Sequence, residues 1–172
     1  MQSIYPLNPT IDLGGSGLYT TAPDYIAFLT SLLRNDGKLL KPQTVDLMFD
    51  YRVPDERIFK SEKVKEWFED SVETGMDLDH CLYGVVNLRD LKTGRKSGGV
   101  QWGGATRCHW VSWSHFSSRK FFPADRRRQW IDRAGGICGF YGSQILGPGE
   151  TLSSEMYKKF QVAVYASQPT FK

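Results

Sequence analysis

The sequence has few of the residues that mark disulfide-bonded or metal-binding proteins. Its 172 residues include three cysteines and three histidines. Cys81, Cys108 and Cys138 are odd in number, and no two have C-x-x-C spacing, which argues against a disulfide framework and a zinc site. The histidines show no metal-ligand spacing with carboxylates or cysteines. These absences favour a protein of a reducing, cytoplasmic compartment that holds no metal.

Long hydrophobic runs and targeting signals are also missing. No window has the apolar length of a membrane-spanning helix, and residues 1–20 lack the basic start and apolar core of a secretory signal. The chain is 40% apolar and 24% charged, which is an ordinary globular composition. The sequence therefore predicts one domain with its own core and no membrane partner.

Positive charge is concentrated in a single segment. The net charge is +3, but residues 111–129 contain five basic residues against Asp125 alone. The rest of the chain is therefore slightly acidic. Five basic residues with two phenylalanines are weak grounds for nucleic-acid binding, so we expect no nucleic-acid partner.

Two helices are predicted near the start of the chain. Thr21 is a suitable N-cap because Asp24 follows three residues later. An apolar stripe at helical spacing follows it and consists of Tyr25, Phe28, Leu29, Leu32 and Leu33. Pro42 opens a second, shorter helix. Its inner face is expected to carry Val45, Met48 and Phe49.

The rest of the chain predicts two more helices and three strands. The helices are expected over 61–73 and 153–166, and the strands over 82–88, 98–110 and 136–146. The buried stripe of the last helix is predicted to be Met156, Phe160, Ala163 and Val164.

Short links between successive strands favour an antiparallel sheet, so the expected class is α+β, with the sheet flanked by helices. We expect a single partial domain over 1–172, mainly helical over 1–81 and with the strands and final helix over 82–172.

Three stretches together resemble the serine β-lactamase-related (class C-like) esterases and acyltransferases, and within them the fungal lovastatin-type branch. They are GGSGLYTTAPDYIAFLTSLLRNDGKLLKPQTVDLM, the pair VQWGGATRCHW and WIDRAGGICGFYGSQIL, and EMYKKFQVAVY. The family has a glycine turn with two helices, a catalytic-sheet hairpin and a final helix at these places. The resemblance covers most of the chain outside 50–81 and 111–129. It implies the C-terminal portion of a β-lactamase/penicillin-binding-protein-like fold.

The resemblance implies chemistry through an acyl-enzyme, on esters, lactones or acyl thioesters, without a metal or organic cofactor. A serine attacks the small-molecule acyl substrate, while a lysine one helical turn later and a tyrosine move its proton. The family's S-x-x-K and tyrosine motifs precede the glycine turn, and this chain begins just before that turn. We therefore expect no catalytic residue here and an inactive chain. The alternative is a non-catalytic binding or interaction remnant, which docks onto a complementary N-terminal fragment.

Two short motifs imitate catalytic ones. Residues 117–120 spell S-x-x-K, but they follow the W-G-G strand, and Phe121-Phe122-Pro123 interrupts any helix there. Lys92-Thr93-Gly94 spells the K-T-G of many β-lactamases, but it lies in a polar stretch. We interpret the second motif as a turn and assign neither of them a catalytic role.

The resemblance also implies which residues bind the substrate. Trp102, Gly103 and Gly104 would form one wall of an acyl pocket, because glycines allow close approach. The backbone N–H of Ala105 would donate to the oxyanion, and Gly15 and Ser16 would line the opposite wall. From the residues alone, a structural tryptophan before a glycine-rich strand and a plain turn serine remain open as alternatives.

Residues 111–129 look like an insertion in a strand. Without them Trp110 would adjoin Trp130, and RCHWWIDRAGGICGFYGSQ would form a hairpin that turns at 132–136. Insertions are normally accepted at exposed loop tips. We therefore propose translation of a retained intron, since Val111-Ser112 and Gln129 have codons that match donor and acceptor sites and whole codons keep the frame. The alternative is a genuine basic surface loop.

Overall fold

The computed structural model describes residues 20–54, 73, 75–103, 126–143 and 151–167. Within them the chain forms a five-stranded antiparallel sheet in sequence order, β1-β2-β3-β4-β5. The strands are β1 (Leu78–His80), β2 (Val85–Asn87), β3 (Val100–Gly103), β4 (Arg126–Asp132) and β5 (Ile137–Ser143). The helices are α1 (Ala22–Arg34), α2 (Pro42–Asp50) and α5 (Thr151–Ala166).

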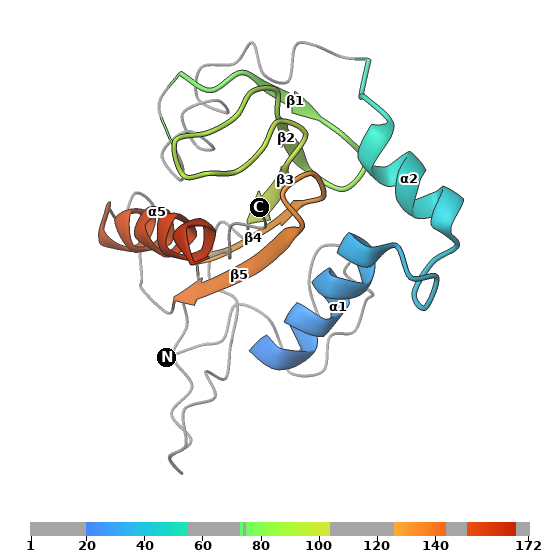
Figure 1. Ribbon diagram of the computed structural model, residues 1–172, viewed down its shortest axis with the longest axis horizontal. Coiled ribbons are helices and arrows are strands. Elements are labelled where there is room, and N and C mark those ends of the chain that lie inside the picture. The colour runs from blue at the N-terminus through green and yellow to red at the C-terminus, as the bar shows by residue number, and fades with distance from the viewer. Residues whose placement is uncertain (1–19, 55–72, 74, 104–125, 144–150, 168–172) are drawn as a thin grey trace, which may run out of the picture.

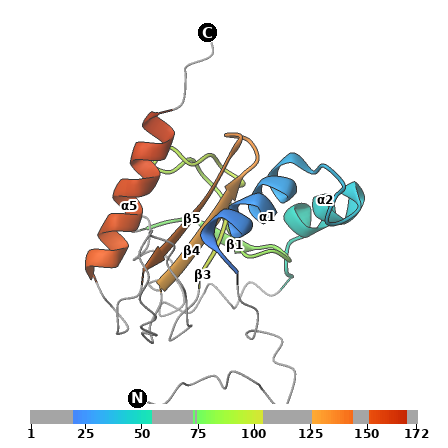
Figure 2. The ribbon, with the colours of Figure 1, turned by 90° about the horizontal axis from the view of Figure 1, so that it is seen from below.

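These elements form three layers. Helices α1 and α2 lie on one face of the sheet and α5 lies on the other (Figures 1 and 2). The arrangement confirms the α+β class and the antiparallel sheet with flanking helices. The hairpin between β4 and β5 turns over residues 133–136, where the sequence predicts a turn.

Helix α1 begins as its sequence predicts. The Thr21 side chain accepts a hydrogen bond from the Asp24 backbone N–H at 3.2 Å, and its hydroxyl donates to the Asp24 carboxylate at 2.6 Å. Asn35 ends the helix in the left-handed region at φ 51°. Leu29 and Leu32 are buried, but Phe28 is 39% exposed, so its prediction as an inward residue is wrong. The stripe that α1 buries is narrower than its sequence indicates.

A hydrophobic core fills each side of the sheet. The α1-side core joins both N-terminal helices to β2, β3 and β4, and its buried members are Leu29, Leu32, Val45, Phe49, Cys81, Val86, Val100 and Ile131. The α5-side core consists of Met76, Leu91, Trp130, Ile137 and Tyr157. Strand β4 contributes Ile131 to the first core and Trp130 to the second, so it is held from both sides of the sheet.

The strand boundaries differ from their predictions in three places. Strand β1 lies in the part expected to be mainly helical. It was not predicted because its three residues, Leu-Asp-His, are too few and too polar to show the alternation of a strand. The strand expected over 82–88 is shorter in the structure and is β2, Val85–Asn87. Residues 126–129, assigned to the insertion, form the first half of β4. Residues 61–72 and 104–110 lie outside the described part of the chain.

The buried side of α5 also corrects its prediction. Met156 and Phe160 are 54% and 38% exposed, Ala163 is exposed and Val164 is only partly buried. The buried positions are Ser154, Tyr157 and Gln161. The periodicity of the apolar residues predicted that the apolar stripe is buried. Instead, α5 faces the sheet with polar side chains that form hydrogen bonds there.

Tyr83 offers a test of the α1-side core. Its ring stacks on Phe49 with centroids 5.3 Å apart, while its buried hydroxyl has no hydrogen-bond partner in the described part of the chain. Leaving a buried hydroxyl unpaired costs about 1–3 kcal/mol. Tyr83→Phe is therefore expected to raise the free energy of unfolding by about 1 kcal/mol. Urea unfolding at neutral pH measures this change, and a loss of stability would contradict it.

The same variant is expected to reduce the alkaline loss of stability. Burial raises the pKa of Tyr83 above the ordinary value of 10.0, so the folded state holds the proton more tightly than the unfolded state does. This contribution is complete below about pH 10 and is lost as the pH rises beyond it, by up to about 1.4 kcal/mol per pH unit. Unfolding at about pH 8 and about pH 11 should show a smaller difference for Tyr83→Phe than for the wild-type chain.

Candidate functional site

The candidate site lies at the end of β3, where the tryptophan-glycine pair is placed. Trp102 is 41% exposed and Gly103 is partly buried. In the sheet register Trp102 stands opposite Gln129, and Gly103 opposite Arg128. The other residues predicted for the pocket lie outside the described part of the chain: Gly15, Ser16, Gly104 and Ala105. The assignment of a substrate pocket to these six residues stays a prediction.

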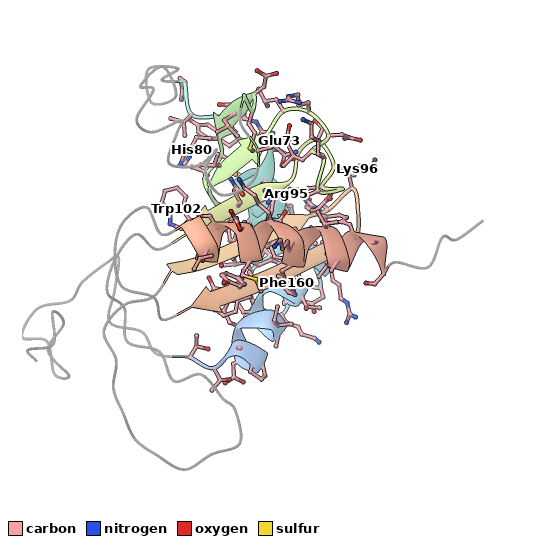
Figure 3. All side chains as sticks on the ribbon, turned by 90° about the vertical axis from the view of Figure 1, so that its left-hand side faces the viewer. Glu73, His80, Arg95, Lys96, Trp102 and Phe160 are labelled. Atoms are coloured by element: carbon pink, nitrogen blue, oxygen red, sulfur yellow. The ribbon has the colours of Figure 1, made fainter. Side chains whose placement is uncertain are left out.

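His80 lies beside Trp102, a contact that no sequence pattern predicted. The two rings meet edge to face, with centroids 5.8 Å apart and planes at 80° (Figure 3). His80 is held at the end of β1, where its carbonyl accepts a hydrogen bond from the Val53 N–H at 2.9 Å. The pair forms an aromatic surface at one end of the sheet. Because β1 was not predicted as a strand, no pattern could have brought His80 to Trp102.

A buried guanidinium lies on the opposite side of β3, facing α5. Arg95 is completely buried and donates to the Oε1 atoms of Gln101 at 2.9 Å and Gln161 at 2.7 Å. Both amides point their oxygens toward Arg95, because a guanidinium only donates hydrogen bonds. Arg95 forms no ion pair with any residue in the described ranges. Since Gln101 precedes Trp102, these bonds attach the tryptophan's strand to α5.

The Asp132 carboxylate supports the same region. It accepts hydrogen bonds from the backbone N–H groups of Lys96 at 2.8 Å and Gly135 at 2.7 Å, and from the Tyr165 hydroxyl at 2.8 Å. Burial, and then the nearby Asp132 charge, raise the pKa of Tyr165, so its phenol stays a donor. One carboxylate thus joins the loop before β3, the β4–β5 turn and the end of α5.

The K-T-G motif lies in a turn, as its sequence predicts. The Leu91 N–H donates to the Arg95 carbonyl at 2.8 Å, and the Gly94 N–H donates to the Leu91 carbonyl at 2.9 Å. Gly94 has φ +103° and lies so close to Tyr165 that a Cβ there would be 2.7 Å from the tyrosine Cβ. The motif therefore serves packing against α5. The S-x-x-K at 117–120 is outside the described ranges.

Two other kinds of site were searched for in the same ranges. No three histidine, cysteine, aspartate or glutamate side chains of the described residues lie together as metal ligands would. No helix among them combines the length and the apolar character needed to cross a membrane.

Similar proteins are fungal esterases and acyltransferases. The chain is 26% identical over 165 residues to a lovastatin esterase from Penicillium rubens, a match that covers 92% of this chain and 37% of the esterase. It is 26% identical over 167 residues to a monacolin J acid methylbutanoyltransferase from Aspergillus terreus, covering 89% and 34%. The chain thus spans about a third of the length of these relatives. No protein-family model matches it.

A solved structure shares the fold. Unliganded simvastatin synthase (LovD) from Aspergillus terreus superposes with a TM-score of 0.60 at 24% identity, over 83% of this chain and 33% of that one. The structural match shows a shared fold, while the sequence matches to the esterase and the acyltransferase indicate common ancestry. Together they confirm the resemblance that the glycine turn, the W-G-G strand and the final helix indicate. The chain is therefore related to the fungal lovastatin esterases and acyltransferases of β-lactamase-like fold, and corresponds to a C-terminal portion of such a protein.

Proposed function

We propose that this chain supplies one wall of the acyl-binding site of a serine esterase or acyltransferase and that the attacking serine comes from another polypeptide segment. The observation that carries the proposal is the exposed Trp102 beside Gly103, at the end of a strand whose Val100 lies in the α1-side core and whose Gln101 accepts a hydrogen bond from the buried Arg95. An exposed indole next to a glycine offers an apolar surface and room for an acyl chain. The substrate is accordingly a small ester, lactone or acyl thioester.

Each of the remaining predicted residues has a role in this proposal. Gly104 continues the wall, and the Ala105 N–H donates a hydrogen bond to the oxyanion as the serine attacks. Gly15 and Ser16 line the opposite side. His80 contacts Trp102 edge to face and limits how far the indole can turn. We assign none of these groups the role of nucleophile, so the chain alone is expected to be inactive.

Hydrolysis of p-nitrophenyl butyrate tests the proposal. The chain alone is expected to show no turnover above background. Mixing it with a second polypeptide, the part of the Penicillium rubens lovastatin esterase outside the matched 37%, is expected to produce hydrolysis. Trp102→Ala should then lower kcat/KM by about tenfold, while Leu47→Ala, an exposed change on α2, should leave it unchanged.

Two results would contradict the proposal. Saturable hydrolysis by the chain alone that Ser117→Ala abolishes would place the nucleophile in this sequence. Binding of the second polypeptide without any hydrolysis would favour the alternative, a non-catalytic interaction remnant of the same fold.

A further inference from the structure

The residues of strand β3 contain little that would fix its register. Among its four residues Val100 is the one buried apolar side chain, since Trp102 is 41% exposed and Gly103 has no side chain. Glycines occupy 98–99 before the strand and 103–104 at its end. Register is weakly specified in short, glycine-rich strands, and a slip by one residue turns every side chain to the other face of the sheet. Such a slip would remove Trp102 from the wall of the acyl-binding site.

The other buried side chain of β3 is polar. In the sheet register Gln101 stands between Val85 on β2 and Trp130 on β4, which are both completely buried. Its Oε1 accepts a hydrogen bond from Nη1 of Arg95 at 2.9 Å. Because side chains alternate along a strand, a contact that holds Gln101 on the α5 side also keeps Trp102 on the opposite side.

The position of Arg95 is fixed by its own loop and by α5. The Arg95 carbonyl accepts a hydrogen bond from the Leu91 N–H at 2.8 Å, and the next residue, Lys96, donates its backbone N–H to Asp132 at 2.8 Å. The second guanidinium nitrogen, Nη2, donates to Gln161 of α5 at 2.7 Å (Figure 3). The guanidinium is therefore a fixed point to which strand β3 is attached.

A cation in this place is a poor means of stabilising the fold. Arg95 is completely buried and forms no ion pair with the residues that the structure describes. Among those residues its Nε, and the Nε2 atoms of Gln101 and Gln161, also lack hydrogen-bond partners. Apolar side chains of similar volume often stabilise a fold as well as a buried charged network or better, and the best-attested use of such a network is to specify register.

We infer that Arg95 is a positioning residue, which sets the register of β3 through Gln101 and thereby the face of the sheet on which Trp102 meets the acyl substrate. A slipped strand would withdraw the Gln101 oxygen and leave a buried cation with one acceptor fewer. The inference rests on the proposed function and deepens it, because it names the group that holds Trp102 in the wall without touching the substrate.

Fluorine NMR of the full chain labelled with 5-fluorotryptophan tests the register. Trp102→Phe assigns the Trp102 resonance among those of the five tryptophans. The triple variant Arg95→Met/Gln101→Leu/Gln161→Leu is expected to unfold at the same temperature as the wild-type chain or higher. Its Trp102 resonance is expected to split or broaden, because β3 then samples more than one register.

Two further variants keep this test decisive. Gln101→Leu alone should split the resonance in the same way, since it releases β3 and leaves the bond from Arg95 to Gln161. Thr93→Val is the matched control, because it removes a buried hydroxyl 3.4 Å from Gln161 Oε1 without touching Gln101, and its Trp102 resonance should stay single. A single, unshifted resonance in the triple variant or in Gln101→Leu would overturn the inference. Equal splitting in the control, or loss of folding by both variants, would also overturn it.

Hydrolysis of p-nitrophenyl butyrate supplies the functional readout. The chain is mixed with the part of the Penicillium rubens lovastatin esterase outside the matched 37%. The triple variant is expected to lower kcat/KM by about tenfold, and adding Trp102→Ala to it should cause no further loss, because both changes act on the same wall. Additive losses would overturn the route through Trp102. Absence of hydrolysis by the wild-type mixture would contradict only the proposed function, because the fluorine spectrum does not depend on turnover.

Discussion

Deleting residues 111–129 is expected to stabilise the domain by about 2–3 kcal/mol and to raise its Tm by roughly 5–10 °C. The sheet register shows why. Residues 126–129 form the first half of β4 and pair with β3 and β5. In the shortened chain residues 107–110 would take the β4 positions that residues 126–129 occupy in the full chain. His109 then stands opposite Gly103, and only five residues link the paired positions instead of 24.

Two physical terms favour the shorter chain. Closing a link of five residues instead of 24 costs about 1.4 kcal/mol less in chain entropy. Trp110 also replaces Gln129, which stands opposite Phe140 and accepts a hydrogen bond from Tyr25. An indole there would pack against the Tyr25 and Phe140 rings, whose centroids are 4.9 Å apart. Such packing contributes about 1–2 kcal/mol beyond the lost hydrogen bond.

Urea and thermal unfolding of both chains measure the gain. Gln129→Trp in the full chain is the matched control, because it adds the indole without shortening the link and should show about half of the gain. A deletion variant that is less stable than the full chain would mean that 111–129 is a genuine part of the domain. The proposed retained intron has a separate test. If every mature transcript contained the segment, that origin would be excluded.

The elements that depend on local signals were predictable from the sequence. The Thr21 cap, the proline that opens α2 and the glycine turn after Asp132 each depend on residues within a few positions of one another. The same holds for the K-T-G turn. Such signals act through backbone conformation and nearby hydrogen bonds, which a single stretch of sequence contains in full.

The buried side of α5 and the His80–Trp102 contact were not predictable from periodicity. A hydrophobic pattern assumes that the apolar face of a helix turns inward. In α5 the buried Arg95 outweighs that pattern, because its guanidinium needs acceptors and Gln161 provides one. Strand β1 has only three residues, so nothing local indicated that His80 would reach the W-G-G strand. Both misses involve partners distant in the sequence.

Gly139→Ala is expected to destabilise the fold by about 3 kcal/mol or more. Gly139 on β5 stands opposite Trp130 on β4. A Cβ at this position would lie 2.0 Å from Cη2 of the indole, far inside contact distance. The ring has no room to move away, since Trp130 is completely buried and the Tyr157 and Phe160 rings meet it edge to face at 5.8 and 5.7 Å. The absent side chain of Gly139 is therefore what allows Trp130 to lie across β5.

A double-mutant cycle distinguishes this clash from a general intolerance of β5 to substitution. Trp130→Phe alone is expected to cost about 1–2 kcal/mol, and in its presence Gly139→Ala should cost at least about 1 kcal/mol less than in the wild-type chain. Gly142→Ala on the same strand is the control, because its nearest side-chain neighbour is an ordinary 3.4 Å away, and it should cost under about 0.5 kcal/mol. Additive losses would contradict the clash. Because Trp130 also pairs with Gln101, which precedes Trp102, the Gly139→Ala change should in addition displace the indole of Trp102 and alter its fluorescence.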